Sequence, residues 1–209
     1  MTTTAIIGLG QMGKGLAKRL AGKTDLVLSS RDSAAATAFA ATLPVGVTVL
    51  DRDAAIAKAD IVVLALPFAL ALEAAANPAL AGKIVLDISN PITPDFSGLT
   101  IGHTTSAAEQ LQGAAPSARV VKGYNTIFAG LFDRPASETA GIPVFIAGSD
   151  EAAVADIETL IKLSGFAVEK TGGIEAARLL EPLGMLNIRL GYGLGHGPGI
   201  APSWIKLAA

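Results

Sequence analysis

The sequence predicts an α/β fold: a doubly wound, mostly parallel Rossmann sheet of about eight strands, with a small helical C-terminal part. Short apolar runs alternate with Ala-rich stretches of helical spacing, which is typical of βαβ units. Ala, Val, Leu and Ile supply most of the 51% hydrophobic residues, as strands buried on both faces require. A glycine motif directly follows the first apolar run. We therefore expect a parallel sheet with helices on both faces.

Eight apolar runs have the length of strands. The first stops at glycines, and the fourth is apolar throughout. The expected strands are Thr3–Gly8, Asp25–Ser29, Val45–Leu50, Ile61–Ala65, Lys83–Ile88, Arg119–Tyr124, Pro143–Ala147 and Phe166–Lys170.

The helices between these strands carry start and stop signals. Ser33 and Ser149 are expected N-caps, Pro44 ends the second helix, and Ser106 and Glu109 have the spacing of a capping box. A loop rich in Pro, Gly and Thr is expected over residues 89–104. The expected helices are Met12–Ala21, Ser33–Leu43, Asp51–Ala59, Phe68–Ala76, Ser106–Gln112, Ser149–Leu163 and Ile174–Gly191.

The composition changes near Gly172, where strands end and one long apolar helix begins. We expect an NADP-binding Rossmann domain over residues 1–172. Residues 173–209 would form a C-terminal helix and a Gly-rich tail. The helix is apolar on most faces and must be buried, so we expect it to pack on a second subunit and form a homodimer. Pro182 should kink it or follow a frayed first turn.

The composition excludes several classes of protein. The formal charge is −2, from 16 basic and 18 acidic residues, so a nucleic acid is not expected as a partner. The chain has no cysteine and two histidines, and we expect no metal site. The most apolar run lies between Asp60 and Glu73 and is shorter than the ~18 residues of a membrane span. Residues 1–4 lack the basic stretch of a signal peptide, so we expect a cytoplasmic protein.

Gly8-Leu9-Gly10-Gln11-Met12-Gly13 is a GxGxxG motif between an expected strand and an expected helix. Gly8 permits the tight turn, Gly10 lets the backbone approach a pyrophosphate, and Gly13 lets the helix pack close to the strand. The free N–H groups at the helix start would face the phosphates. We assign all six residues of the motif to a dinucleotide site, against the alternative of a turn without a ligand.

The tip of the second strand indicates which dinucleotide binds. An NAD site usually has an acidic residue about 20 residues after the glycines. Here the chain has Ser30 and Arg31, and a guanidinium suits the 2′-phosphate of NADP. We therefore expect NADP(H) as the cofactor. Asp32 would either weaken the phosphate site or cap the next helix.

The order of these motifs resembles the NADPH-dependent reductases of the deazaflavin coenzyme F-420, the F420H2:NADP oxidoreductases. The resemblance covers nearly the whole chain. It implies a Rossmann domain with a small helical C-terminal part, NADP(H) as cofactor and a deazaflavin as second substrate. The matching stretches are Ile7–Gly13, Ser30–Arg31, Ala65–Pro67, Asp87–Pro91, Val121–Ile127 and Gly173–Arg178, and the segments Tyr124–Ile127 and Ala177–Glu181 are the more specific ones.

The resemblance also implies site residues. Leu66 and Pro67 would flank the nicotinamide ribose, with Phe68 beside them where family members often carry Trp. Asn90 and Pro91 would lie at the same sheet edge. The positions that pack on the nicotinamide ring and orient its amide are matched by Ile127 and Ala129.

No catalytic residue is identified from the sequence. Tyr124 and Tyr192 could donate a proton, Lys122 is an exposed strand lysine or a cofactor contact, and Asp87 is a structural carboxylate rather than a base. Hydride transfer to a flavin-like ring needs alignment more than acid–base groups. Three functions stay open: hydride transfer between NADP(H) and a planar ring such as a deazaflavin or flavin, reduction of a small carbonyl or imine compound, and a non-catalytic NADP(H)-binding redox sensor.

Overall fold

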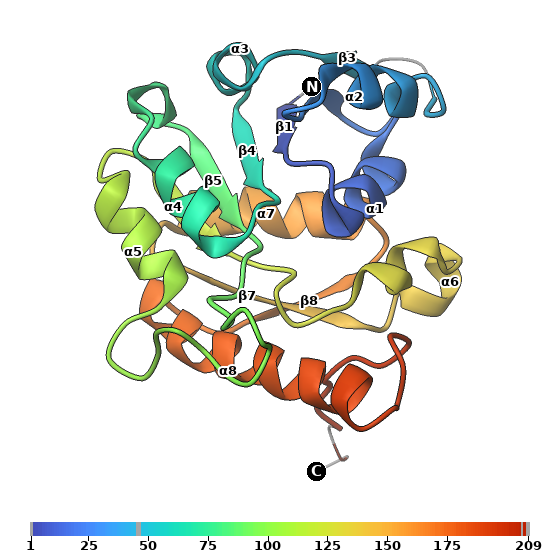
Figure 1. The fold of residues 1–209 in the computed structure, drawn as a ribbon, viewed down its shortest axis with the longest axis vertical. Helices are drawn as coiled ribbons and strands as arrows, with labels where there is room; N and C mark the ends of the chain where they lie inside the picture. The colour runs from blue at the N-terminus through green and yellow to red at the C-terminus, as the bar shows by residue number, and fades with distance from the viewer. Residues whose placement is uncertain (1, 45–46, 206, 208–209) are drawn as a thin grey trace.

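The computed structural model describes residues 2–44, 47–205 and 207. Within them the strands form one eight-stranded sheet in the order β3-β2-β1-β4-β5-β6-β7-β8, which confirms the predicted Rossmann architecture (Figure 1). Residues 45 and 46 of the expected third strand lie outside the described residues. The strands are β1 (Thr3–Ile7), β2 (Asp25–Ser29), β3 (Val47–Val49), β4 (Ile61–Leu64), β5 (Ile84–Asp87), β6 (Arg119–Lys122), β7 (Pro143–Gly148) and β8 (Ala167–Lys170).

The first six strands are parallel, so their carboxyl ends meet at one edge of the sheet. Ile7 pairs with Ser29 and with Leu64, which places the ends of β1, β2 and β4 level. The sheet then reverses, because β7 pairs antiparallel with β6 and β8 is parallel to β7. Ligands in open α/β sheets bind at carboxyl ends near the point where the strand order reverses, here between β1 and β4.

The seven predicted helices form in the predicted order, with two corrections to their caps, and a short helix between β6 and β7 was not predicted. Asp32, not Ser33, caps α2 through a 2.8 Å bond from the Ala35 N–H. Asp150, not Ser149, caps α7. In both pairs the carboxylate is the residue with extended backbone angles directly before the helix. The helices are α1 (Gln11–Leu20), α2 (Ser33–Ala40), α3 (Arg52–Lys58), α4 (Phe68–Ala75), α5 (Ala107–Ala114), α6 (Ala136–Thr139), α7 (Glu151–Leu163) and α8 (Ala177–Ile188), with 3-10 helices η1 (Pro78–Leu80), η2 (Ala129–Asp133) and η3 (Ile174–Ala176).

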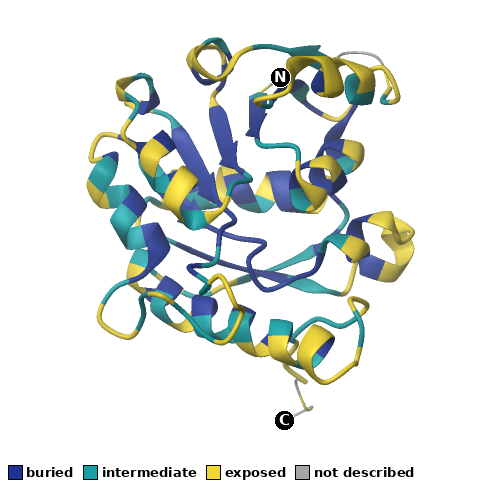
Figure 2. Ribbon diagram, in the orientation of Figure 1, coloured by how far each residue is buried: buried dark blue, intermediate teal, exposed yellow. Residues whose placement is uncertain are grey.

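Alternate side chains of each central strand enter separate cores on the two faces of the sheet. Ile6 packs in one core with side chains of α1 and α7. Its neighbours Ala5 and Ile7 pack in the other with α3, α4 and α5. The central strands are therefore buried on both sides, as Figure 2 shows in dark blue. The Ser106 capping box also forms, because the Ser106 hydroxyl accepts from the Glu109 N–H at 3.1 Å.

The C-terminal segment lies against β7 and crosses the lower part of the molecule in Figure 1. Leu180 packs on Phe145 and Ala147 of β7. Pro182 lies inside α8, which continues into a π-helical turn, η4 (Arg189–Gly193). The boundary at residue 172 follows the end of β8, but a separate domain there stays a prediction. None of the helices in the described ranges has the length and apolar composition that crossing a membrane requires.

Candidate active site

The glycine motif has the backbone geometry of a phosphate-binding turn. Gly8 has φ +101°, and a Cβ there would lie 2.4 Å from the Ala65 carbonyl oxygen. A Cβ on Gly13 would lie 2.0 Å from the carbonyl oxygen of Gly8, so both positions require glycine. A Cβ on Gly10 would meet no atom within 4 Å, so the approach to the start of α1 is open. No side chain caps α1, and its first turn has no acidic residue. Its N-terminal N–H groups can therefore bind an anion.

The residues after β2 lie on the same sheet edge as Gly8. The Gly8 N–H donates to the carbonyl of Ser29 at 2.9 Å, which joins the two loops. Arg31 is exposed, and no hydrogen bond or ion pair involves it within the described residues. The Asp32 carboxylate caps α2, so it is engaged by the backbone and not by the guanidinium. The structure thus favours the capping role for Asp32 and leaves Arg31 available to a ligand.

The segments after β4 and β5 complete this edge. Pro67 is the N-cap of α4, Phe68 begins the helix, and Leu66 lies next to Gly8. Asn90 donates from Nδ2 to the Asn125 carbonyl at 2.8 Å and accepts from the Asn125 amide at 3.0 Å. Pro91 is buried beside Asn90. The segments after β5 and β6 are therefore held together by a pair of amide hydrogen bonds.

A cavity of about 220 Å³ opens between this sheet edge and α8. It contains five of the predicted site residues: Gln11, Met12, Asn90, Ile127 and Ala129. The other ten predicted residues do not line it. The full lining is Gln11, Met12, Ile88, Asn90, Phe96, Tyr124, Asn125, Thr126, Ile127, Phe128, Ala129, Gly184, Asn187, Ile188 and Tyr192.

The lining is apolar and aromatic, with hydroxyl and amide groups but no charged side chain among the described residues. Phe128 and Tyr192 meet edge to face, with ring centroids 5.0 Å apart. Asn125 Oδ1 and Thr126 Oγ1 are buried without a hydrogen-bond partner in the described structure. A neutral planar group with amide-like hydrogen-bonding positions suits such a surface, because nothing there would neutralise an ionic ligand.

Lys122 is fully buried, which contradicts both predicted roles of a surface lysine and a cofactor contact. Its Nζ lies 2.8 Å from Asp87 Oδ2, 3.0 Å from Glu181 Oε1 and 2.5 Å from the Ser89 carbonyl oxygen. Glu181 also accepts from the N–H groups of Ala107 and Ala108, at the start of α5. Asp87 is thus structural, as predicted. This buried cluster ties α8 to β5, β6 and α5, and sequence reasoning missed it.

The two tyrosines and the two histidines differ in their access to the cavity. The Tyr124 hydroxyl hydrogen bonds to Ser164 Oγ at 2.7 Å, and burial raises the pKa of Tyr124 far above its usual range. Tyr124 is therefore a poor proton donor. Tyr192 lines the cavity and is exposed. His103 and His196 are exposed, and neither contributes to the lining.

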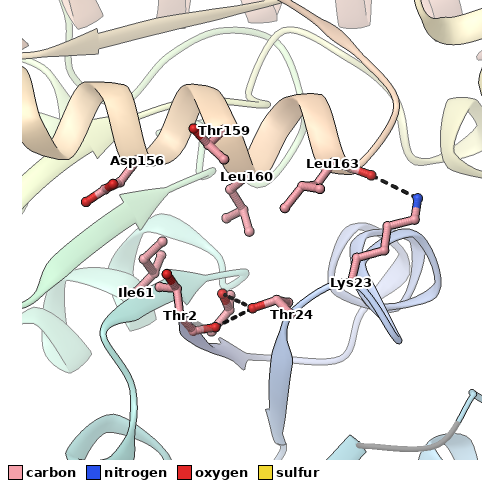
Figure 3. Close-up of a pocket in the computed structure, with 9 residues that line it drawn as sticks. Thr2, Lys23, Thr24, Ile61, Asp156, Thr159, Leu160 and Leu163 are labelled. Carbon is pink, nitrogen blue, oxygen red and sulfur yellow. Dashed lines mark hydrogen bonds between the residues drawn. The ribbon is translucent and has the colours of Figure 1, made fainter.

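A second hollow, of about 200 Å³, lies at the opposite edge of the sheet (Figure 3). Thr24 donates to the Thr2 carbonyl at 2.5 Å, and Lys23 donates to the Leu163 carbonyl at 2.9 Å. Ile61, the first residue of β4, marks this edge as the amino end of the parallel strands. The glycine turn lies at the carboxyl end of these strands, so this hollow is not the dinucleotide site.

The fold, the glycine turn and the cavity at the carboxyl edge define a Rossmann-type dinucleotide-binding oxidoreductase. The family model described as NADP oxidoreductase, coenzyme F420-dependent, matches residues 3–91. A candidate F420-dependent NADP reductase from Arthrobacter sp. FB24 is 33% identical, with a TM-score of 0.84, over 99% of this chain and 100% of that one. The chain belongs to the family of coenzyme F420-dependent NADP oxidoreductases.

Two more distant proteins share parts of this architecture. The metalloreductase STEAP3 of Rattus norvegicus is 28% identical over 181 residues, which are 85% of this chain. The match spans 35% of the length of that curated relative. An imine reductase from Aspergillus terreus, solved with NADPH4, is 21% identical with a TM-score of 0.69, over 93% of this chain and 63% of that one. At that identity the likeness shows the fold alone.

The buried cluster predicts a large stability change. Lys122→Met leaves the carboxylates of Asp87 and Glu181 buried without a cation, and we expect a loss of about 3–5 kcal/mol in the free energy of unfolding. Lys170→Met removes a lysine that is 56% exposed and paired with Glu158, and should cost less than about 1 kcal/mol. Urea unfolding at neutral pH measures both. Equal effects of the two substitutions would contradict the assigned role of Lys122.

Proposed function

We propose that this chain binds NADP(H) at the carboxyl edge of its sheet and transfers a hydride between it and a planar ring acceptor such as a deazaflavin or flavin. Membership of the family of NADP oxidoreductases supports the class of reaction. The acceptor is inferred from the cavity. A cytoplasmic location and the absence of nucleic-acid partners stay predictions.

The proposed pyrophosphate site is the turn of residues 8–13. It fits because the space at Gly10 is open and the first N–H groups of α1 have no side-chain cap. Ser30 and Arg31 would hold the 2′-phosphate, and the unpaired guanidinium of Arg31 supports this assignment. The proposed phosphate sites thus consist of backbone N–H groups at the glycine turn and one positively charged side chain, that of Arg31.

The nicotinamide end would reach the cavity. Leu66, Pro67 and Phe68 follow β4 beside the glycine turn, where they would flank the nicotinamide ribose. Asn90 and Pro91 follow β5 at the same edge, and Ile127 and Ala129 extend the wall after β6. This row leads from the phosphate turn to the cavity, which suits an extended dinucleotide.

The observation that carries the acceptor assignment is the uncharged, aromatic lining of the cavity. When bound, the nicotinamide supplies the hydride. The protein would align the two rings with reacting atoms ~3–3.5 Å apart and exclude water. Reduction of a deazaflavin also takes one proton, which solvent can supply. The buried, hydrogen-bonded Tyr124 is therefore not needed as an acid.

The two alternatives make different demands. Reduction of a small carbonyl or imine compound would need a proton donor at the nicotinamide, and Tyr192 is the one exposed tyrosine in the described lining. If Tyr192→Phe abolishes turnover of such compounds, that alternative gains support. A redox sensor would bind NADPH tightly and reduce no acceptor.

The direct test is to mix the purified protein with NADPH and oxidised deazaflavin and to follow the loss of the deazaflavin absorbance. We expect fast bleaching with NADPH and slow bleaching with NADH, because only NADPH carries the 2′-phosphate that Arg31 would hold. NADPH binding without bleaching of a deazaflavin or a flavin would contradict the proposed acceptor and support the alternatives.

Arg31→Ala tests the cofactor assignment. A charge-assisted hydrogen bond contributes about 1.5–3 kcal/mol. Because Arg31 is exposed and solvent screens its charge, we expect the lower end, about a tenfold rise in the Kd of NADPH. The Kd of NADH should barely change. Arg119→Ala removes the same charge from the start of β6, at the opposite edge, and serves as the control. Equal losses for both cofactors would refute the phosphate assignment.

We also propose that the outer face of α8 packs on a second copy of the chain. Leu179 is 73% exposed and Leu186 is 51% exposed, and these residues lie two turns apart on one face of the helix. The predicted C-terminal part, residues 173–209, would then form both a wall of the cavity and the dimer interface. Burial of such side chains favours association by the hydrophobic effect.

Leu186→Arg should convert a dimer into a monomer, because the charge would be buried without a partner. Light scattering should give a mass near twice 21.1 kDa for the parent chain and near 21.1 kDa for the variant. Leu163→Arg, at a 39% exposed position on α7, should leave the mass unchanged. A Leu186→Arg variant that stays dimeric would exclude this interface.

A further inference from the structure

The loop after β5 presents one phenylalanine at the cavity. Phe96 is 65% exposed although its side chain is large and apolar. Together with Ile88 and Asn90, which also follow β5, it lines the cavity to which α8 contributes Gly184. An exposed phenylalanine at a concave site has apolar surface that a ligand can cover.

The backbone at Phe96 is held in a conformation that a phenylalanine rarely adopts. Its φ is +58°, in the left-handed region that disfavours residues with a Cβ and a bulky ring. Such a conformation is unfavourable for a phenylalanine and persists only where the surrounding structure enforces it. Asn or Gly would fill this position with less strain, so folding alone does not explain the phenylalanine.

A network of hydrogen bonds enforces that conformation. The Thr93 N–H donates to the Gly98 carbonyl, and the Phe96 N–H donates to the Thr93 carbonyl, both at 2.9 Å. The Asp95 carboxylate accepts from the Thr93 hydroxyl at 2.6 Å and from the Ser97 hydroxyl at 2.8 Å. These bonds lower the pKa of Asp95 to about 2, so it is ionised throughout the range of enzyme assays. These hydrogen bonds therefore hold the loop, and the backbone of Phe96 with it, in one conformation before a ligand binds.

We propose that Phe96 is an acceptor-specificity residue, whose ring packs on the face of a planar polycyclic acceptor bound in the cavity. The proposal rests on the proposed function, because it places the acceptor in the same cavity. Phe128 and Tyr192 form an aromatic wall that such an acceptor would also contact. Stacking favours an extended ring over a small carbonyl or imine compound, which has too little surface to cover a phenyl ring.

The test compares three variants of the full chain. Phe96→Asn removes the ring but tolerates positive φ, Phe96→Tyr keeps the ring, and Leu163→Asn makes the same apolar-to-amide change at the far edge of the sheet. The KM of oxidised deazaflavin, kcat, the Kd of NADPH and the melting temperature are measured for each.

We expect Phe96→Asn to raise the KM of the deazaflavin about tenfold, with an unchanged Kd for NADPH and an equal or higher melting temperature. The Phe96→Tyr variant should keep the KM within about twofold of the parent chain, as should Leu163→Asn. A purely structural role predicts the opposite pattern, in which Phe96→Asn lowers the melting temperature and weakens NADPH binding. That pattern, or an unchanged KM in Phe96→Asn, overturns the proposal.

Failure of the proposed function is distinguishable from failure of this inference. If the parent chain reduces no deazaflavin, binding is measured instead, by the quenching of deazaflavin fluorescence on addition to the protein–NADP⁺ complex. Binding that Phe96→Asn weakens about tenfold supports the Phe96 contact without the reaction. Deazaflavin binding that Phe96→Asn leaves unchanged, or no binding by the parent chain, overturns the Phe96 contact.

Discussion

The buried ammonium of Lys122 holds the cavity together. It neutralises Asp87 from β5 and Glu181 from α8, at 2.8 and 3.0 Å, in a place that water does not reach. One cation faces two carboxylates, and the remaining negative charge lies at the start of α5, where the N–H groups of Ala107 and Ala108 donate to Glu181. A buried charge without its partner is costly. Movement of α8 away from the sheet would separate Glu181 from Lys122, and is therefore unfavourable.

The position of α8 determines the shape of the cavity. Beside Glu181, the Leu180 carbonyl accepts from the Asn125 amide at 2.8 Å, and about two turns further on, Asn187 donates to the Thr126 carbonyl at 3.2 Å. Gly184 permits this approach, because a Cβ there would lie 2.7 Å from the Asn125 carbonyl oxygen. The C-terminal helix is thus a wall of the site, fixed at both ends to the segment after β6.

Much of the fold could be predicted because its signals are local. The turn at residues 8–13 lies between adjacent elements, and each apolar run is a strand by itself. The antiparallel β7 has no local signature, since strand direction depends on the path of the connection. The partners of Lys122 lie 35 and 59 residues away in sequence, so a lysine ending an apolar strand looked like a surface residue. Phe96 was also missed because of distance in sequence, since only the folded chain brings it and residues of α8 to the same cavity.

The two halves of the proposed site recognise their ligands by different physics. At the phosphate end, backbone N–H groups and the free guanidinium of Arg31 provide charge that salt can screen. The described lining of the cavity contains no charge, and contact between rings is short-ranged and almost independent of salt. The proposed hydride transfer, in which the nicotinamide alternates between a neutral and a cationic ring, would use this contrast: strong electrostatics away from the reacting atoms, and a rigid apolar enclosure around them. The buried charges of Lys122, Asp87 and Glu181 supply that rigidity without lining the cavity. The ammonium and the N–H groups at the start of α5 together offset the two carboxylates behind its wall.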